Sequence, residues 1–133
     1  MQRPGARPPG RAARIGLLIQ AYDATAGLVG NTVAAGLGAN AAGPAAALVQ
    51  RTLREDPPVL ATRRVGPAGE TVTLDLACAG NDPAGHLEFG YGPRACPGAA
   101  HACALAEGAV EPLLARCYWT GAEISYPPPP ALH

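Results

Sequence analysis

The sequence predicts a mainly α-helical chain with a small β component. Residues 14–36, 45–55 and 97–116 have helical character, and two short runs at 59–65 and 70–76 alternate and carry β-branched residues. Ala, Gly and Pro make up 61 of the 133 residues, whereas Leu, Ile, Val and Phe together number only 25. An ordinary globular domain holds more large apolar residues, so we expect a thin hydrophobic core.

The first predicted helix, residues 14–36, has a narrow apolar face made largely of small side chains. Residues 1–13 before it hold three Pro and are predicted to be a disordered Arg/Pro-rich head. Small side chains leave room for another group to approach the helix closely. The apolar and small residues recur at helical spacing at Leu17, Ala21, Ala24, Leu28 and at Leu18, Tyr22, Val29, Val33.

The second predicted helix, residues 45–55, has clear start and stop signals. Pro44 suits the first turn of a helix. Asp56 is followed by proline, and a residue before proline is disfavoured in the α region. The two predicted strands that follow are joined by residues 66–69, Gly-Pro-Ala-Gly, which is typical of a tight turn.

The last predicted helix follows a Gly- and Pro-rich loop at residues 81–98. Cys103 and Cys117 are predicted to be small core residues of this helix. Residues 121–133 contain four consecutive Pro and are predicted to be an extended tail. The chain therefore divides into a head, one domain at 14–120, and a Pro-rich tail.

The charge balance excludes several classes of partner. Ten Arg, no Lys and ten acidic residues give a formal net charge of zero, which indicates neither nucleic acid nor an anionic membrane surface as a partner.

We expect no membrane span, because no uncharged stretch is apolar enough. The four cysteines are too far apart for a CxxC site and no export signal is evident, so we expect a reducing, cytoplasmic compartment.

The most informative stretch is residues 89–98, Phe-Gly-Tyr-Gly-Pro-Arg-Ala-Cys-Pro-Gly. Gly90 and Gly92 permit backbone conformations that a Cβ would forbid. Cys96 stands just before a predicted helix, whose N-terminal amides and dipole favour a thiolate. Arg94 supplies a permanent cation with a fork suited to carboxylates.

These ten residues resemble the haem-thiolate signature FGxGxRxCxG of the cytochrome P450 family at every fixed position. The resemblance implies a partial cytochrome P450-like fold and a haem b cofactor with Cys96 as the axial ligand of its iron. In the simpler alternative, the stretch is a Gly-rich surface loop with a buried structural cysteine. The residues that the resemblance implies for cofactor binding around Cys96 are Phe89, Gly90, Gly92, Arg94 and Gly98.

Other blocks resemble the same family in the same order, over about residues 15–117. Residues 54–64 look like the stretch after the family's ExxR helix, which implies Arg63 as a ligand of a haem propionate, with Arg64 as the alternative. The first helix is similar to the central helix that crosses the haem, which implies proton delivery by Asp23 and Thr25. Only the C-terminal part of a normal family member is covered.

Two departures from the family pattern bear on activity. Arg51 takes the place of the Glu in ExxR, three residues before Arg54. Cations at this spacing repel, and Glu55 is placed to neutralise Arg51. Ala24 takes the position of the family's Thr after the acid, and the hydroxyl is displaced to Thr25 by one residue, or about 100° on a helix.

Two functions follow from these features. The resemblance implies an oxidoreductase, a haem-thiolate monooxygenase that oxidises a small organic substrate with O2 and electrons from a separate ferredoxin or flavoprotein reductase. The departures and the truncation favour the alternative, a non-catalytic cytochrome P450 remnant or a haem-binding or interaction module.

Overall fold

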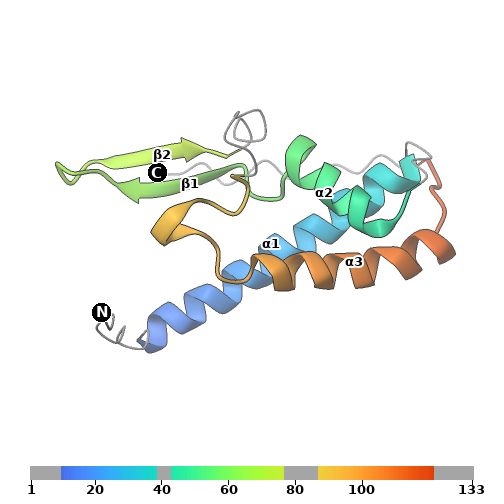
Figure 1. Ribbon diagram of the computed structural model, residues 1–133, viewed down its shortest axis with the longest axis horizontal. Coiled ribbons are helices and arrows are strands. Elements are labelled where there is room, and N and C mark those ends of the chain that lie inside the picture. The colour runs from blue at the N-terminus through green and yellow to red at the C-terminus, as the bar shows by residue number, and fades with distance from the viewer. Residues whose placement is uncertain (1–9, 39–42, 77–86, 122–133) are drawn as a thin grey trace.

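The computed structural model describes residues 10–38, 43–76 and 87–121, and within them the prediction of a mainly helical fold with a small β component is confirmed (Figure 1). Helices dominate, and one two-stranded antiparallel sheet accompanies them. Among the described residues no helix is long and apolar enough to cross a membrane. The elements in chain order are α1 (Arg11–Gly38), α2 (Ala45–Glu55), β1 (Ala61–Val65), β2 (Thr71–Asp75), the 3-10 turn η2 (Gly92–Arg94) and α3 (Ala99–Arg116).

Helix α1 is longer than predicted. It begins at Arg11, three residues before the expected start, and its first turn is closed by a hydrogen bond from the Arg14 amide to the Gly10 carbonyl (3.1 Å). Residues 11–13, which were assigned to the disordered head, are therefore helical. They are Arg, Ala and Ala, which have high helix propensity. Residues 1–9 and 122–133, which hold the rest of the predicted head and nearly all of the predicted tail, lie outside the described residues.

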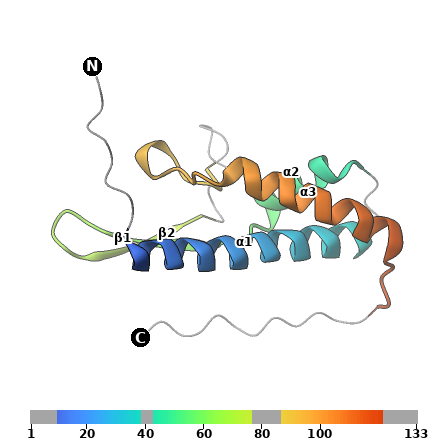
Figure 2. The ribbon, with the colours of Figure 1, turned by 90° about the horizontal axis from the view of Figure 1, so that it is seen from below.

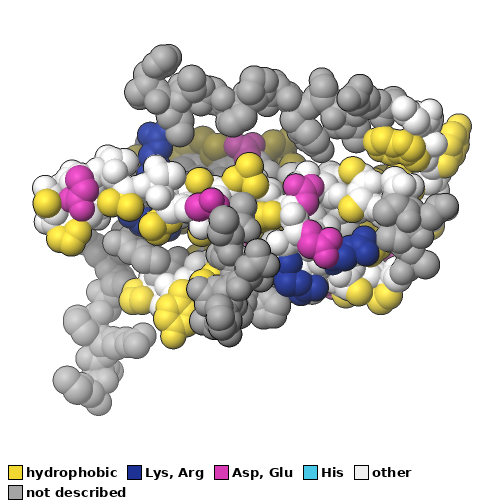
Figure 3. Space-filling model, turned by 90° about the horizontal axis from the view of Figure 1, so that it is seen from above, with side chains coloured by type: hydrophobic (Ala, Val, Ile, Leu, Met, Phe, Trp, Pro, Cys, Tyr) yellow, Lys and Arg dark blue, Asp and Glu magenta, His cyan; other side chains and the backbone are white. Residues whose placement is uncertain are grey.

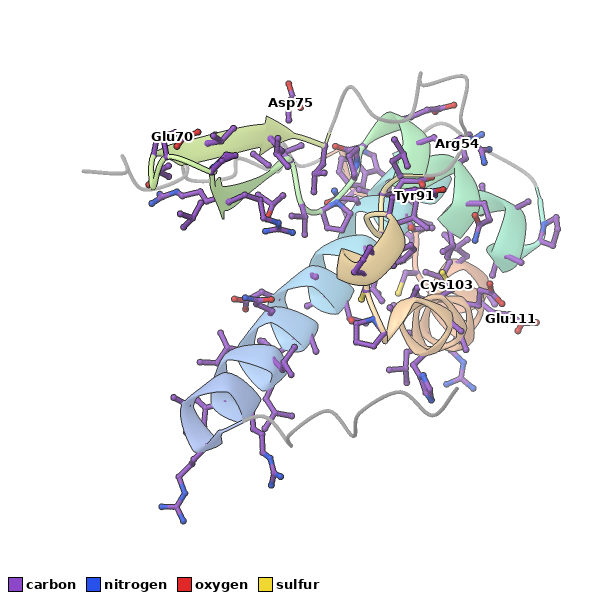
Figure 4. The ribbon with its side chains drawn as sticks, turned by 60° about the vertical axis from the view of Figure 1, so that its left-hand side comes forward. Arg54, Glu70, Asp75, Tyr91, Cys103 and Glu111 are labelled. Carbon is purple, nitrogen blue, oxygen red and sulfur yellow. The ribbon has the colours of Figure 1, made fainter. Side chains whose placement is uncertain are left out.

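The three helices meet at one small hydrophobic cluster. Figure 2 shows α3 lying along the C-terminal half of α1, and α2 contacts both. The N-terminal half of α1 extends beyond its neighbours (Figure 4), and Leu18 on it is 72% exposed. The expectation of a thin core is thus confirmed for the described residues. The buried cluster consists of Leu28, Val49, Leu53, Ala106 and Val110.

Two glycines of α1 lie where other parts of the chain approach the helix most closely. A Cβ at Gly27 would lie 2.9 Å from the Cβ of Pro58, and a Cβ at Gly36 would lie 2.8 Å from Cδ2 of Leu114. Both distances are shorter than normal van der Waals contact. The small side chains of this helix therefore accommodate groups of the chain itself, from the segment after α2 and from α3.

The two strands form a hairpin with the predicted turn. Ala61 pairs with Asp75 and Val65 with Thr71, and the Gly66 amide donates to the Glu70 carbonyl (2.8 Å). Gly69 has φ of 83°, a left-handed value that favours glycine. The strands are shorter than the predicted runs, and nearly all of their residues are exposed.

The close contact at Gly27 gives a test of this packing. Gly30→Ala is the matched control, because a Cβ there meets nothing within 4 Å and alanine raises helix stability by about 1 kcal/mol. Gly27→Ala gains the same propensity but pushes against the rigid Pro58 ring. We expect its free energy of unfolding to be lower than that of Gly30→Ala by about 1 to 3 kcal/mol, the usual cost of overpacking. Urea unfolding followed by circular dichroism measures the difference, and equal stabilities would contradict the packing.

Candidate functional site

The stretch at residues 89–98 forms a closed loop before α3. The Cys96 amide donates to the Phe89 carbonyl at 2.7 Å, which brings the two ends of the motif together. The Gly90 amide donates to the carbonyl of Leu87, two residues before the loop (2.8 Å), and within the loop the Ala95 amide donates to the Gly92 carbonyl (3.2 Å). The loop is thus held by its own backbone.

Two of the glycines are required by the backbone of this loop. Gly90 has φ of 76° and Gly92 has φ of 61°, both in the left-handed region. The conformational role that the sequence predicts for these residues is confirmed. Gly98 differs, with φ of −99°, and a Cβ there would lie 3.9 Å from Sγ of Cys96 in ordinary contact.

Phe89 anchors the loop to the helical core. Its side chain is half-buried and packs against the cluster that contains Leu28, Val49 and Val110. Because the Phe89 carbonyl also accepts the Cys96 amide, the loop is fixed at its root, while residues 91–93 and 95–97 are exposed.

Cys96 lies at the surface, two residues before Gly98, the N-cap of α3. The Ala99 amide is directed at the Cys96 carbonyl oxygen (3.5 Å). A buried structural cysteine, which was part of the surface-loop alternative, is therefore wrong for this residue. The exposed thiol is accessible to a ligand or a reagent.

The two candidate arginines of β1 differ in their surroundings. Both are exposed, and as neighbours on a strand they face opposite sides of the hairpin. Arg64 Nη1 donates to Thr62 Oγ1 (2.6 Å) and to the Arg63 carbonyl (2.8 Å), so its guanidinium is held along the strand. Of the two, Arg63 is therefore the better candidate for the propionate ligand that the resemblance implies. The backbone of Arg94 lies in η2, and its side chain is outside the described part of the structure.

The structure does not bring Asp23 and Thr25 together. Asp23 is exposed and Thr25 is half-buried, and α1 is an uninterrupted α-helix around them. Two residues on such a helix are separated by about 200°, so the two side chains leave nearly opposite sides. No bulge or turn of the helix compensates for the displaced hydroxyl.

Helix α2 carries the altered ExxR segment. Arg51 Nε lies 3.8 Å from Glu55 Oε2, so the neutralising pair expected from the sequence is confirmed. Figure 4 shows Arg54 on the outer side of α2, and its side chain is exposed. An open cleft of about 510 Å³ lies between this helix and the end of α1, apart from the Cys96 loop. It is lined by Ala34, Ala35, Gly38, Arg51, Thr52, Glu55 and Asp56.

The second cysteine of interest is Cys103, on α3. It is half-buried against the hydrophobic cluster, as predicted, whereas Cys117 is exposed just past the end of α3, so its prediction as a core residue was wrong. Gln50 Nε2 on α2 lies 3.8 Å from the Cys103 sulfur, a contact that the sequence did not predict. Burial raises the pKa of Cys103, Glu107 raises it further, and the Gln50 hydrogen bond lowers it.

Comparisons with known protein families, with curated proteins and with solved structures found no match to this chain. The cytochrome P450 resemblance therefore stays a prediction that rests on the residues of the Cys96 loop and on the order of the blocks around it.

The contacts of Cys103 predict that substitutions of Glu107 and of Gln50 by uncharged residues shift its pKa in opposite directions. In a chain whose other cysteines are replaced by Ala, Glu107→Gln removes a nearby negative charge and lowers the Cys103 pKa towards its ordinary value. Gln50→Ala removes a donor to the thiolate and raises the pKa. The pH dependence of iodoacetamide alkylation measures both, and shifts of the same sign would contradict the described contacts.

Proposed function

We propose that this chain binds haem b through the thiolate of Cys96 and uses it, as the cytochrome P450 resemblance implies, to oxidise a small organic substrate. The observation that carries the proposal is the shape of the ligand loop. Gly90 and Gly92 hold left-handed backbone conformations, and the Cys96 amide is tied to the Phe89 carbonyl. This leaves an exposed thiol on a loop whose root is fixed in the core.

The residue types present in the Cys96 loop and in β1 fit such a cofactor in their chemistry. A thiolate is a soft ligand suited to haem iron, and arginine remains charged at all relevant pH values and suits the carboxylates of propionates. In this proposal Cys96 ligates the iron, while Arg63 and Arg94 hold the propionates. Phe89 keeps the loop in place through its contact with the core.

A bound haem with a thiolate ligand would supply electron density that favours O–O bond cleavage. Electrons would come from a separate ferredoxin or flavoprotein reductase, since the sequence carries no flavin or iron–sulfur motif. Asp23 is available to exchange protons with solvent, because its side chain is exposed on α1.

A second candidate is a protein that binds haem without monooxygenase activity. The separation of Asp23 and Thr25 on α1 favours it, because a proton relay needs donor and acceptor within hydrogen-bond reach. Arg51 favours it too, because it stands where the family's ExxR pattern has Glu and it pairs with Glu55, so Arg54 has no Glu three residues before it.

Haem reconstitution of the purified chain tests the ligand. The reduced, carbon monoxide-bound protein is expected to show the red-shifted Soret band of thiolate ligation. Cys96→Ala is expected to abolish that band, whereas Cys117→Ala, the matched control with another exposed thiol, should leave it unchanged. A chain that takes up no stoichiometric haem, or a band that survives Cys96→Ala, would refute the proposal.

Oxygen consumption separates the two candidates once haem is bound. With a surrogate ferredoxin and reductase, a monooxygenase forms one oxidised product for each O2 consumed. A protein that binds haem without this activity releases the consumed oxygen as peroxide or consumes none. Thr25→Ala should lower product yield in the first case and change nothing in the second.

A further inference from the structure

The N-terminal half of α1 carries an apolar stripe on one face. Its members are spaced three and four residues apart, so on an uninterrupted α-helix they lie within an arc of about 100°. Each is at least half exposed, and the exposed fraction reaches 72% at Leu18 and 75% at Tyr22. The α1 stripe consists of Ile15, Leu18, Ile19 and Tyr22.

The α1 stripe continues a side of the helix that is packed farther along. Val29 and Val33 stand seven and eleven residues after Tyr22, which places all three on the same side of the helix. Both valines pack against the hydrophobic cluster. Figures 1 and 4 show the N-terminal half of α1 projecting beyond α2 and α3. Among the described residues, the apolar side of α1 therefore extends beyond the part that α2 and α3 cover.

Positive charge is concentrated at the same end of the chain. The net charge of zero, which by itself indicates no anionic partner, averages over two unequal parts. The first 22 residues hold four of the ten Arg and none of the ten acidic residues, the first of which is Asp23. By contrast, Figure 3 shows acidic and basic side chains near one another on the face that carries α2. The four Arg are Arg3, Arg7, Arg11 and Arg14.

One of these arginines lies in line with the apolar residues. Arg11 is exposed and stands four residues before Ile15, on the same side of α1. The stripe thus has a cation at its N-terminal end, and no acidic residue precedes Asp23 at its other end. A lipid surface with negative headgroups above apolar acyl chains is complementary to both features.

We propose that the N-terminal half of α1 binds to the surface of a membrane that contains anionic phospholipids. The α1 stripe lies among the acyl chains, and Arg11 contacts the headgroup phosphates. Amphipathic helices with basic residues bind in the plane of the interface in this way. A nucleic acid would use the arginines but leave the stripe in water. A second copy of this segment would offer the arginines no carboxylate, because the first 22 residues contain none.

Co-sedimentation with lipid vesicles tests the surface on the full chain without haem, so its result is independent of haem binding. We expect binding to phosphatidylcholine vesicles that contain phosphatidylserine, and binding at least about tenfold weaker to phosphatidylcholine alone. Leu18→Ser removes an apolar side chain from the stripe and should weaken binding at least about fivefold. Leu105→Ser is the matched control, because Leu105 on α3 is 65% exposed and outside the stripe, and it should leave binding unchanged.

Three results would overturn the proposal. The first is a chain that stays in solution with phosphatidylserine vesicles at millimolar lipid. The second is binding that Leu18→Ser and Leu105→Ser weaken equally, with both variants folded by circular dichroism. The third is another occupant in place of lipid: a dimer that forms without vesicles and dissociates in Leu18→Ser, or tighter binding to a mixed-sequence DNA duplex that Leu18→Ser leaves unchanged.

Tryptophan fluorescence tests which side of α1 enters the lipid. The chain has one native Trp, so Trp119→Phe gives a background without tryptophan. In this background Leu18→Trp should shift its emission to shorter wavelengths on phosphatidylserine vesicles. Gln20→Trp is the control, because position 20 is exposed and lies about 200° around the helix from position 18, so its emission should stay that of tryptophan in water. Equal shifts at the two positions would overturn the assignment of the α1 stripe as the lipid-binding side.

Discussion

The close approach of α1 to the rest of the chain is the contact on which the described structure depends. Few large apolar residues are available, so the helices make a stable core only if their axes come close together. Gly27 and Gly36 allow this, because Pro58 and Leu114 occupy the space where their side chains would be. The contact of Leu114 with Gly36 joins α3 to α1 at the C-terminal end of α3, and the Cys96 loop leaves the core at the other end of this helix.

Local signals account for what the sequence predicts correctly. Some features depend only on a residue and its immediate neighbours. These are the two termini of α2, beside Pro44 and Asp56, the tight turn at Gly69, and the left-handed conformations of Gly90 and Gly92. Steric and capping effects act over this range and are therefore visible in the sequence.

Contacts between distant segments account for what the sequence misses. The hydrogen bond from Gln50 to Cys103 joins residues on two different helices, and no spacing pattern reveals it. Cys117 has helical spacing with the core residues of α3, but the helix ends one residue before it, so it lies exposed. Of the candidate site, the loop backbone follows from its sequence, whereas the position of β1, and so of Arg63, relative to the loop depends on how the elements pack.

The projecting N-terminal half of α1 implies that the chain has no single folding equilibrium. Ile15, Leu18 and Tyr22 are at least half exposed there, so among the described residues no core supports this half, which relies on helix propensity. It can melt while Leu28 and its neighbours stay packed. Backbone amide exchange should then be graded along one continuous helix, fast near Arg11 and slow near Thr32, and a single melting temperature would describe only the second half.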